Sequence, residues 1–214
     1  MAGDDAADCR RCCCSFIFTS GLTALFMWLS LRTCKPTCSI ENFYVPSLNT
    51  TDNSSAARNN HTLYFDLKLK NGMKDKAVYY ANINLTFFYT QNTSRIPVAN
   101  YTVPGFHQGH EKKAHRKELV GASGLPWEAA LHAVSNGSTV SFRVDLATRV
   151  KYKILFWYTK RESLVVTGDV AVDDSGGKVK KKKGIKLKSG APDPARVGPV
   201  FVFSLTMILF LYKY

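Results

Sequence analysis

A regular alternation of apolar and polar residues in the middle of the chain most limits how this sequence can fold. Leu63, Phe65, Leu67 and Leu69 alternate with polar or charged neighbours. Successive side chains of a strand point to opposite faces, so this period of two predicts strands with one buried face. The alternation recurs over residues 83–87, 140–146 and 150–156, and residues 164–172 supply a further strand.

Six or seven short strands and one helix are expected between residues 62 and 177. The only helical pattern outside the chain ends is at residues 127–134. Strands at this spacing favour two packed antiparallel sheets, a mainly β sandwich. A segment of this size can bury one core but not two, so residues 62–177 are predicted to form a single domain.

Seven of the eleven asparagines begin an Asn-x-Ser/Thr sequon, and none has Pro at x. The N-glycosylation acceptors are Asn49, Asn53, Asn60, Asn84, Asn92, Asn100 and Asn136. This excess indicates that the middle of the chain meets the glycosylation machinery of a secretory lumen. Residues 32–61 carry three sequons and are interpreted as an exposed, glycosylated linker. In the strand pattern Asn84 lies opposite the apolar face, so it is expected to point to solvent.

Residues 12–31 contain no charged side chain and would form a helix about 30 Å long, enough to cross a bilayer core. This segment is predicted to be a transmembrane signal anchor, and a cleaved signal peptide is the alternative. The flanking charges balance, so they do not orient it. The sequons do: residues 1–11 are expected to be cytoplasmic, and the main domain extracellular.

The carboxyl-terminal sequence has the order of a glycosylphosphatidylinositol (GPI) signal. Small residues at Ser189 and Gly190 are followed by a spacer and a hydrophobic tail, so residues 178–199 are interpreted as a basic stalk with spacer and 200–214 as the removable tail. Ser189 is the candidate attachment residue and Gly190 the alternative. A second, short transmembrane helix is the competing interpretation.

The six cysteines fall into two groups on either side of the first apolar run. The palmitoylation candidates are Cys9, Cys12, Cys13 and Cys14. Their position next to the membrane favours S-palmitoylation over a zinc site, and unmodified thiols are the alternative. Cys34 and Cys38 follow the run, where the compartment oxidises thiols, and they are disulfide candidates, with each other or with a second chain.

The net charge of +13 does not indicate nucleic-acid binding, because it is concentrated in a short tail. Residues 39–177 hold 16 Lys and Arg against 12 Asp and Glu, for +4. The polybasic run contains Lys178, Lys180, Lys181, Lys182, Lys183, Lys186 and Lys188. It is expected to lie near the outer leaflet or an extracellular polyanion, and a solvated stalk or a lysine-guarded edge strand are the alternatives.

No pattern for catalysis, a metal or a cofactor is found. His107, His110 and His115 are spaced for neither one helical face nor one strand face, so they are interpreted as surface-loop residues. Ser123 lacks the glycine spacing of a nucleophile elbow. An enzyme is therefore the least favoured class.

Several strings, in order, resemble the plant harpin-induced-like family. They include KPTCSIENFYVPSL, NGMKDKAVYYANINLTF, NYTVPGFHQGHEKKA and FRVDLATRVKYKILFWYTKR, and the resemblance covers nearly the whole chain. The outer part of that family is a late-embryogenesis-abundant (LEA) type 2 domain. The resemblance implies a seven-stranded immunoglobulin- or fibronectin-like sandwich, with an N-terminal transmembrane helix and a C-terminal hydrophobic tail.

The resemblance also implies a function without enzyme activity. It points to a plasma-membrane, GPI-anchored component of plant disease-resistance signalling, needed by coiled-coil nucleotide-binding leucine-rich-repeat receptors. Its implied partner is a cytoplasmic-face immune regulator contacted by residues 1–11. One departure is Asn71-Gly72-Met73, where the family usually has Asn-Pro-Asn, so Gly72 is expected to loosen this turn.

Two further hypotheses remain from the sequence. The chain could join membrane to cell wall, with the polybasic run binding an acidic polysaccharide, although no Arg-Gly-Asp or Asn-Gly-Asp tripeptide is present. It could instead be a stress-protective or lipid-contacting domain, which an apolar groove between the sheets would favour.

Overall fold

The computed structural model describes residues 4–31, 33–52, 54–91, 94–154, 156–179 and 184–189. The chain divides into a helical unit and a compact β domain spanning Cys34–Ala191. The helical unit contains α1 (Asp4–Leu31), which covers the apolar run at 12–31.

Helix α1 exposes large apolar side chains around its circumference. Phe16 is 74% exposed and Phe26 and Met27 are each 62% exposed. None of the helices in the described residues is both long enough and apolar enough to cross a membrane. The transmembrane span predicted at residues 12–31 is therefore not confirmed and stays a prediction.

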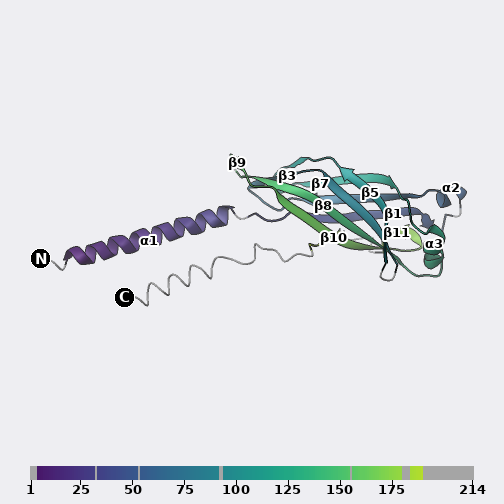
Figure 1. The fold of residues 1–214 in the computed structure, drawn as a ribbon, viewed down its shortest axis with the longest axis horizontal. Coiled ribbons are helices and arrows are strands. Elements are labelled where there is room, and N and C mark those ends of the chain that lie inside the picture. Colours follow the sequence, from purple (N-terminus) through teal and green to yellow (C-terminus); the bar gives the residue numbers. More distant parts are fainter. Residues whose placement is uncertain are drawn as a thin grey trace. The chain divides into compact units, whose positions relative to one another are not determined.

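The β domain consists of two antiparallel sheets (Figure 1). The first sheet is β11-β1-β2-β7, with β12 also paired to β1. Its strands are β1 (Thr37–Asn49), β2 (Thr62–Lys70), β7 (Lys113–Gly121), β11 (Ser175–Gly177) and β12 (Ile185–Lys186). The second sheet is β5-β4-β8-β3-β6, with β9 and β10 also paired to β8. Its strands are β3 (Lys76–Tyr80), β4 (Ile83–Gln91), β5 (Ser94–Val103), β6 (His107–Gln108), β8 (Val140–Ile154), β9 (Trp157–Tyr158) and β10 (Glu162–Val172).

Aromatic side chains from both sheets fill the space between them. Phe43 of β1 lies with its ring centroid 5.3 Å from that of Phe142 of β8, and Phe65 of β2 lies 5.1 Å from Phe87 of β4. All four are at most 2% exposed. These contacts confirm a mainly β, antiparallel fold. The seven-strand count is not confirmed, because the described residues form twelve strands, several of them two or three residues long.

Most of the strands predicted from the alternation are present with the expected buried faces. Leu63, Leu67 and Leu69 of β2 are at most 1% exposed, as are Ile83 and Leu85 of β4. The predicted helix is α3 (Trp127–Ser135), which buries Ala130 and Val134. A second short helix, α2 (Ser55–Arg58), was not expected.

The prediction of an exposed linker at residues 32–61 is wrong for residues 37–49, because they form β1. This strand lies inside the first sheet, between β2 and the short strands β11 and β12. Its apolar pattern is irregular: a register shift between Ile40 and Asn42 puts both Ile40 and Phe43 on the buried face. A bulge of this kind breaks a period of two, so the alternation could not be read from the sequence.

Strand β7 was not predicted from the sequence, and its residue His115 was interpreted as part of a surface loop. It pairs with β2 along nine residues, from Thr62 opposite Gly121 to Lys70 opposite Lys113. It is the last strand in the path of its sheet, and its residues alternate between exposed and half-buried. An edge strand that buries neither face fully carries little apolar signal.

The domain does not end at residue 177 as predicted, because part of the supposed basic stalk is folded into it. Ile185 and Lys186 pair with Ile40 and Ser39 of β1, and Lys188 forms a bridge with Thr167 of β10. Leu187 between them is 6% exposed and belongs to the core. The segment therefore links an edge of the first sheet to the second, as the edge-strand alternative anticipated.

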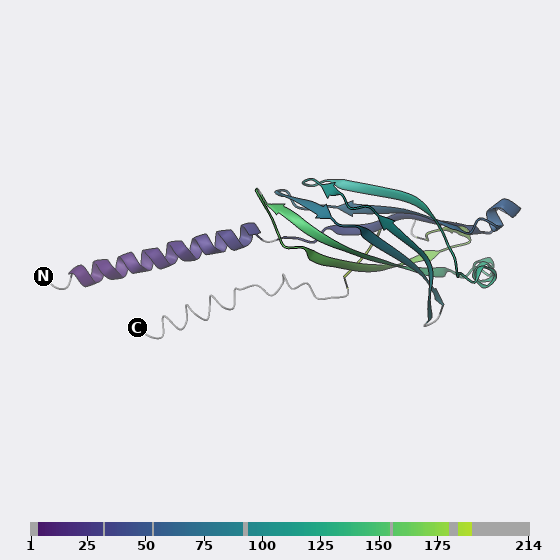
Figure 2. The same ribbon diagram turned by 45° about the horizontal axis from the view of Figure 1, so that its top comes forward.

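The β domain has two distinct ends. The hairpin end, as named here, carries the β8–β9 hairpin, and the helix end carries α2 and α3 (Figures 1 and 2). Register places the start of β1 at the hairpin end, because Thr37 pairs with Lys70, the last residue of β2. The loop that follows Lys70 leads to Lys76, which pairs with Ile154 at the end of β8.

Candidate functional site

The three histidines singled out in the sequence do not converge. His107 lies in β6 against the ring of Tyr79, His110 lies in the following turn, and His115 lies in β7. In the described part of the chain, no group of three or more His, Cys, Asp or Glu side chains could hold a metal ion. The surface-loop interpretation is wrong for His107 and His115, because each lies in a strand.

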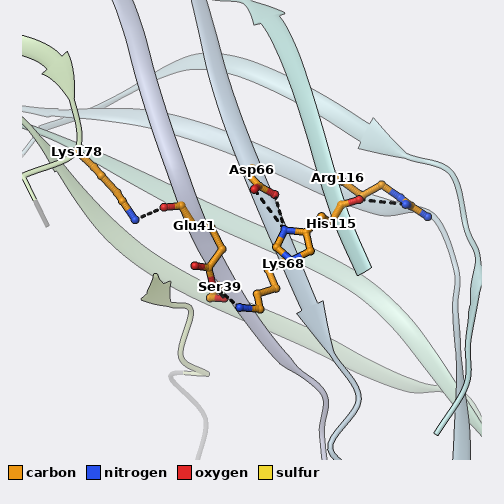
Figure 3. A network of polar contacts seen from close by, with 7 residues as sticks. All are labelled: Ser39, Glu41, Asp66, Lys68, His115, Arg116 and Lys178. Carbon is orange, nitrogen blue, oxygen red and sulfur yellow. Dashed lines mark hydrogen bonds and ion pairs between the residues drawn. The ribbon is translucent and has the colours of Figure 1, made fainter. Parts of the chain in front are cut away.

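A polar network covers the outer face of β1, β2 and β7 (Figure 3). Glu41 Oε1 accepts hydrogen bonds from Lys68 Nζ and from Ser39 Oγ, each at 3.1 Å. On the next strands His115 Nδ1 lies 3.0 Å from Asp66 Oδ1. Asp66 is only 3% exposed although it is charged. A buried carboxyl group is costly without a polar partner, and His115 supplies one to Asp66.

The pKa values of Glu41 and Lys178 are both lowered, for different reasons. Burial raises the pKa of Glu41. The hydrogen bond and charge of Lys68, the hydrogen bond from Ser39 and the charge of Lys178 outweigh burial and lower the pKa below its ordinary value of 4.5. Burial lowers the pKa of Lys178, and Glu41 and Asp66 partly oppose this. Lys178 Nζ donates to the backbone carbonyl of Glu41.

This network does not have the geometry of a catalytic triad. A carboxylate can orient a histidine as a general base. Nucleophilic catalysis also needs a hydroxyl or thiol within hydrogen-bonding distance of that histidine. The hydroxyl in the network, Ser39 Oγ, donates to Glu41 instead. The network is best explained as a set of hydrogen bonds and ion pairs that gives polar partners to the ionisable side chains on this sheet surface.

A shallow pocket of ≈ 450 Å³ lies beside the network. It is lined by Asn42, Phe43, Tyr44, Tyr64, Gly177 and Lys178. This pocket is at the surface of the first sheet, whereas the space between the sheets is packed with aromatic rings. The packed interior does not favour the hypothesis of a lipid-binding groove between the sheets.

The described sequon acceptors differ in accessibility. Asn60, Asn84, Asn100 and Asn136 are exposed, and Asn49 is half-buried. Asn49 Nδ2 donates to the Tyr44 hydroxyl, and its Oδ1 accepts from Thr51 Oγ1 at 2.6 Å. The acceptors Asn53 and Asn92 lie outside the described residues. Asn84 points away from the core, as its strand pattern predicted.

Asn84 and Asn100 lie on one outer surface of the second sheet. In the β4–β5 pairing Asn84 is opposite Thr102 and Asn100 is opposite Thr86. Residues two apart on paired strands share a face, so two glycans would project from the same side. Glycosylation of these sequons stays a prediction.

The cysteines occupy different surroundings. Cys14 and Cys34 are exposed, whereas Cys38 is buried in the core, and all three are free thiols. Burial raises the pKa of Cys38 to about 12. A bond between Cys34 and Cys38 is not formed here, and pairing with a second chain stays a prediction. The side chains of Cys9, Cys12 and Cys13 lie outside the description, so palmitoylation also stays a prediction.

The polybasic run is not one continuous solvated surface. Lys178 is 4% exposed, whereas Lys186 and Lys188 are exposed. Lys180, Lys181, Lys182 and Lys183 lie outside the described residues. The candidate GPI residue Ser189 is exposed and is the last described residue, and Gly190 is outside. The solvated-stalk interpretation is therefore wrong for Lys178.

Asn71 is a structural residue whose role the sequence did not reveal. It is 0% exposed, and its Nδ2 donates to the carbonyls of Lys76 at 2.8 Å and Gly109 at 3.0 Å. Its Oδ1 accepts from the Met73 backbone amide at 3.0 Å. The side chain thus joins two loops at the hairpin end. The Asn-Gly pair signalled a turn, but only the fold shows that its asparagine is buried.

Comparison with known proteins gives one clear relative. The chain is 47% identical over 215 residues to Protein NDR1 of Arabidopsis thaliana, covering 96% of this chain and 94% of the relative. No protein-family profile matches the chain.

Two solved structures show weak likeness. A crystal structure of a protein from Archaeoglobus fulgidus covers 52% of this chain and 85% of its own, at 12% identity and a TM-score of 0.28. A solution structure assigned to the LEA proteins covers 74% of this chain and 85% of its own, at 10% identity and a TM-score of 0.29. These TM-scores are too low to support an argument about the fold.

Proposed function

The chain belongs to the plant non-race-specific disease resistance (NDR1) proteins of the harpin-induced-like family, and from this premise we propose that it is a non-enzymatic component of disease-resistance signalling at the plasma membrane. The observation that carries the proposal is the 47% identity to Protein NDR1 across almost the full length of both chains. The similarity covers 96% of this chain and 94% of the relative.

The proposed topology has residues 1–11 in the cytoplasm and the β domain outside the cell. It is supported by the uncharged run at 12–31, which precedes the domain, and by the exposed sequon acceptors on the domain surface. Palmitoylation at the inner edge and a GPI anchor at Ser189 would add to membrane retention, because stable anchoring generally takes two signals.

The proposed role is to support immunity triggered by coiled-coil nucleotide-binding leucine-rich-repeat receptors, with residues 1–11 contacting a cytoplasmic-face immune regulator. A protein of this kind needs no catalytic site, and the polar network of the first sheet offers none. The network's buried charges instead help to fix the outer surface of the domain.

The test is genetic complementation. Plants that lack their own NDR1 protein should regain restriction of bacterial growth, and ion leakage, when this chain is expressed and the bacteria carry an effector recognised by such a receptor. A matched control is a chain of equal abundance in which residues 1–11 are shuffled, which should accumulate but not restore leakage. If the unaltered chain accumulates at the membrane and resistance is not restored, the proposal fails.

A further inference from the structure

The β8–β9 hairpin exposes a group of aromatic side chains at the hairpin end. Phe156 is 96% exposed, Trp157 is 55% exposed and Tyr158 is 49% exposed. Phe156 was expected to continue the buried alternation of β8, and this expectation is wrong because the strand ends at Ile154. Contiguous exposed aromatic side chains are costly in water and generally mark an interaction surface.

These side chains are held in an ordered hairpin. Lys153 pairs with Tyr158, and the Thr159 backbone amide donates to the Tyr152 carbonyl at 2.9 Å. The ring of Tyr158 lies 5.3 Å from that of Tyr79, between centroids, and Lys151 Nζ is 4.5 Å from the Tyr158 centroid. Because the backbone and one ring are already fixed, little conformational entropy would be lost on binding.

The aromatic group is surrounded by positive charge. Residues 149–161 contain two Arg and three Lys and no acidic residue. On β8, Arg149, Lys151 and Lys153 alternate with the buried residues and therefore face outward. Aromatic rings together with lysine and arginine are the composition that proteins place at the lipid headgroup region.

Both chain connections of the domain run to this end. Residue 37, the first of β1, lies here, and only five residues separate it in sequence from the end of α1. Residues 185–188 run antiparallel to β1, and Leu187 N–H donates to the Cys38 carbonyl at 2.9 Å, so Ser189 also follows toward this end. Anchors before residue 32 and at Ser189 would both tether the hairpin end to the membrane.

The glycan acceptors lie elsewhere. Of the five in the described residues, Asn49, Asn60 and Asn136 are in or beside the segments at the helix end. Asn84 lies opposite Ala147, and Asn100 opposite Thr86, on the side of the second sheet. No acceptor among the described residues belongs to the strand ends around the hairpin, so glycans would not shield it.

We propose that Phe156, Trp157 and Tyr158 lie in the headgroup region of the outer leaflet, with Lys151 and Lys153 beside the lipid phosphates. This contact would hold the β domain in a fixed orientation on the membrane instead of leaving it to swing on its anchors. The inference rests on the membrane attachment proposed above. An acidic polysaccharide could also bind aromatic and basic side chains, and the experiment below distinguishes it.

The test uses the full chain reconstituted into phosphatidylcholine vesicles that contain phosphatidylcholine brominated near the glycerol. The chain has three tryptophans, so single-tryptophan variants are made by changing the other two to Phe. Trp157 should lose roughly half of its emission to bromine, because interfacial side chains lie about 5–10 Å deep. Trp127, in α3 at the helix end, is the control. It should lose less than about a tenth of its emission, because it would lie well beyond the depth at which the bromine atoms quench.

The variant that retains only Trp28, in α1, separates the two proposals. If Trp28 is quenched and Trp157 is not, membrane attachment stands and the hairpin contact is wrong. If neither is quenched, both are wrong. A Trp157 emission that responds to added oligogalacturonate but not to brominated lipid would assign the hairpin to the polysaccharide and overturn the lipid contact.

Substitution of Trp127 could disturb the core, which it contacts. The full chain is therefore also compared with Trp157→Phe, in which only the exposed hairpin ring is removed. The emission intensity that brominated lipid removes should be smaller in this variant, because a quenched side chain is gone, while the unfolding midpoint stays the same. An equal loss of intensity in the two chains would contradict the proposal without relying on the double substitutions.

Discussion

The two ends of the β domain differ in what they present to their surroundings. The helix end carries α2, α3 and the acceptors Asn60 and Asn136, whereas the hairpin end carries exposed aromatic rings and basic side chains. The hairpin end also contains buried polar residues, above all Asn71. The helix end therefore presents predicted glycan acceptors, whereas the hairpin end presents the surface that we propose contacts lipid.

The largest effect on stability is expected from removing the Asn71 side chain at the hairpin end. Asn71→Ala leaves the carbonyls of Lys76 and Gly109 and the Met73 amide without their partner. Each buried polar group without a partner costs about 1–3 kcal/mol, so the free energy of unfolding should fall by roughly 3 kcal/mol. Denaturant unfolding of the purified full chain measures it.

The matched control is Asn100→Ala in protein made without glycans, because Asn100 is exposed. Its unfolding free energy should change by less than about 0.5 kcal/mol. Equal losses in the two variants would show that the hairpin end is not held by Asn71.

A second substitution examines the folded part of the basic segment. Leu187→Ala removes a side chain that is 6% exposed and packed in the core, so a loss of about 2–3 kcal/mol is expected. Val179→Ala changes another apolar residue of the same predicted stalk, which is 45% exposed, and should cost less than about 1 kcal/mol. A Leu187→Ala chain as stable as the parent would restore the interpretation of this segment as a stalk.

The pH dependence of stability examines the polar network of the first sheet. The pKa of Glu41 is lowered in the folded chain, so its contribution is fully present above the ordinary value near 4.5 and is lost as the pH falls through the folded value. Glu41→Gln should therefore destabilise the chain at pH 7 by at most about 1 kcal/mol, and by progressively less as the pH falls below 4.5.

The control for this titration is Glu162→Gln, at an exposed residue of β10. It should alter stability by less at neutral pH than Glu41→Gln does. Urea midpoints at several pH values give the comparison, and a Glu41→Gln effect that stays constant with pH would rule out the ion pair as its source.

The smallest effect on stability is expected from the sequons. Asn84→Gln in plant-made protein should remove one glycan, seen as faster migration on a gel, and should leave the unfolding midpoint nearly unchanged because the side chain is exposed. Asn49 should be glycosylated less fully than Asn84, since Asn49 is half-buried and hydrogen-bonded to Tyr44 and Thr51. Glycopeptide mass spectrometry compares the two, and equal occupancy would contradict this explanation.

How well the sequence predicted each strand depended on the regularity of its burial. Strands β4 and β8 bury every second residue, and the buried apolar residues of β2 also alternate, so a period of two indicated β2, β4 and most of β8. Strand β1 was missed because its bulge shifts the pattern by one residue, and β7 because it is an exposed edge. The candidate surfaces were predicted less well. The run of aromatic residues at 156–158 is visible in the sequence, but only Phe156 was included in the strand pattern, and it was expected on the buried face.

The sequence by itself determined the fold class, the family, the positions of the sequons and the local strand faces, because each of these depends on residues close together in the chain. Only the tertiary structure decided that Asn71 and Lys178 are buried, that Leu187 belongs to the core and that the hairpin shares an end with both chain connections. These depend on pairings between residues far apart, such as Ile40 with Ile185, and a local pattern carries no information about such distant partners.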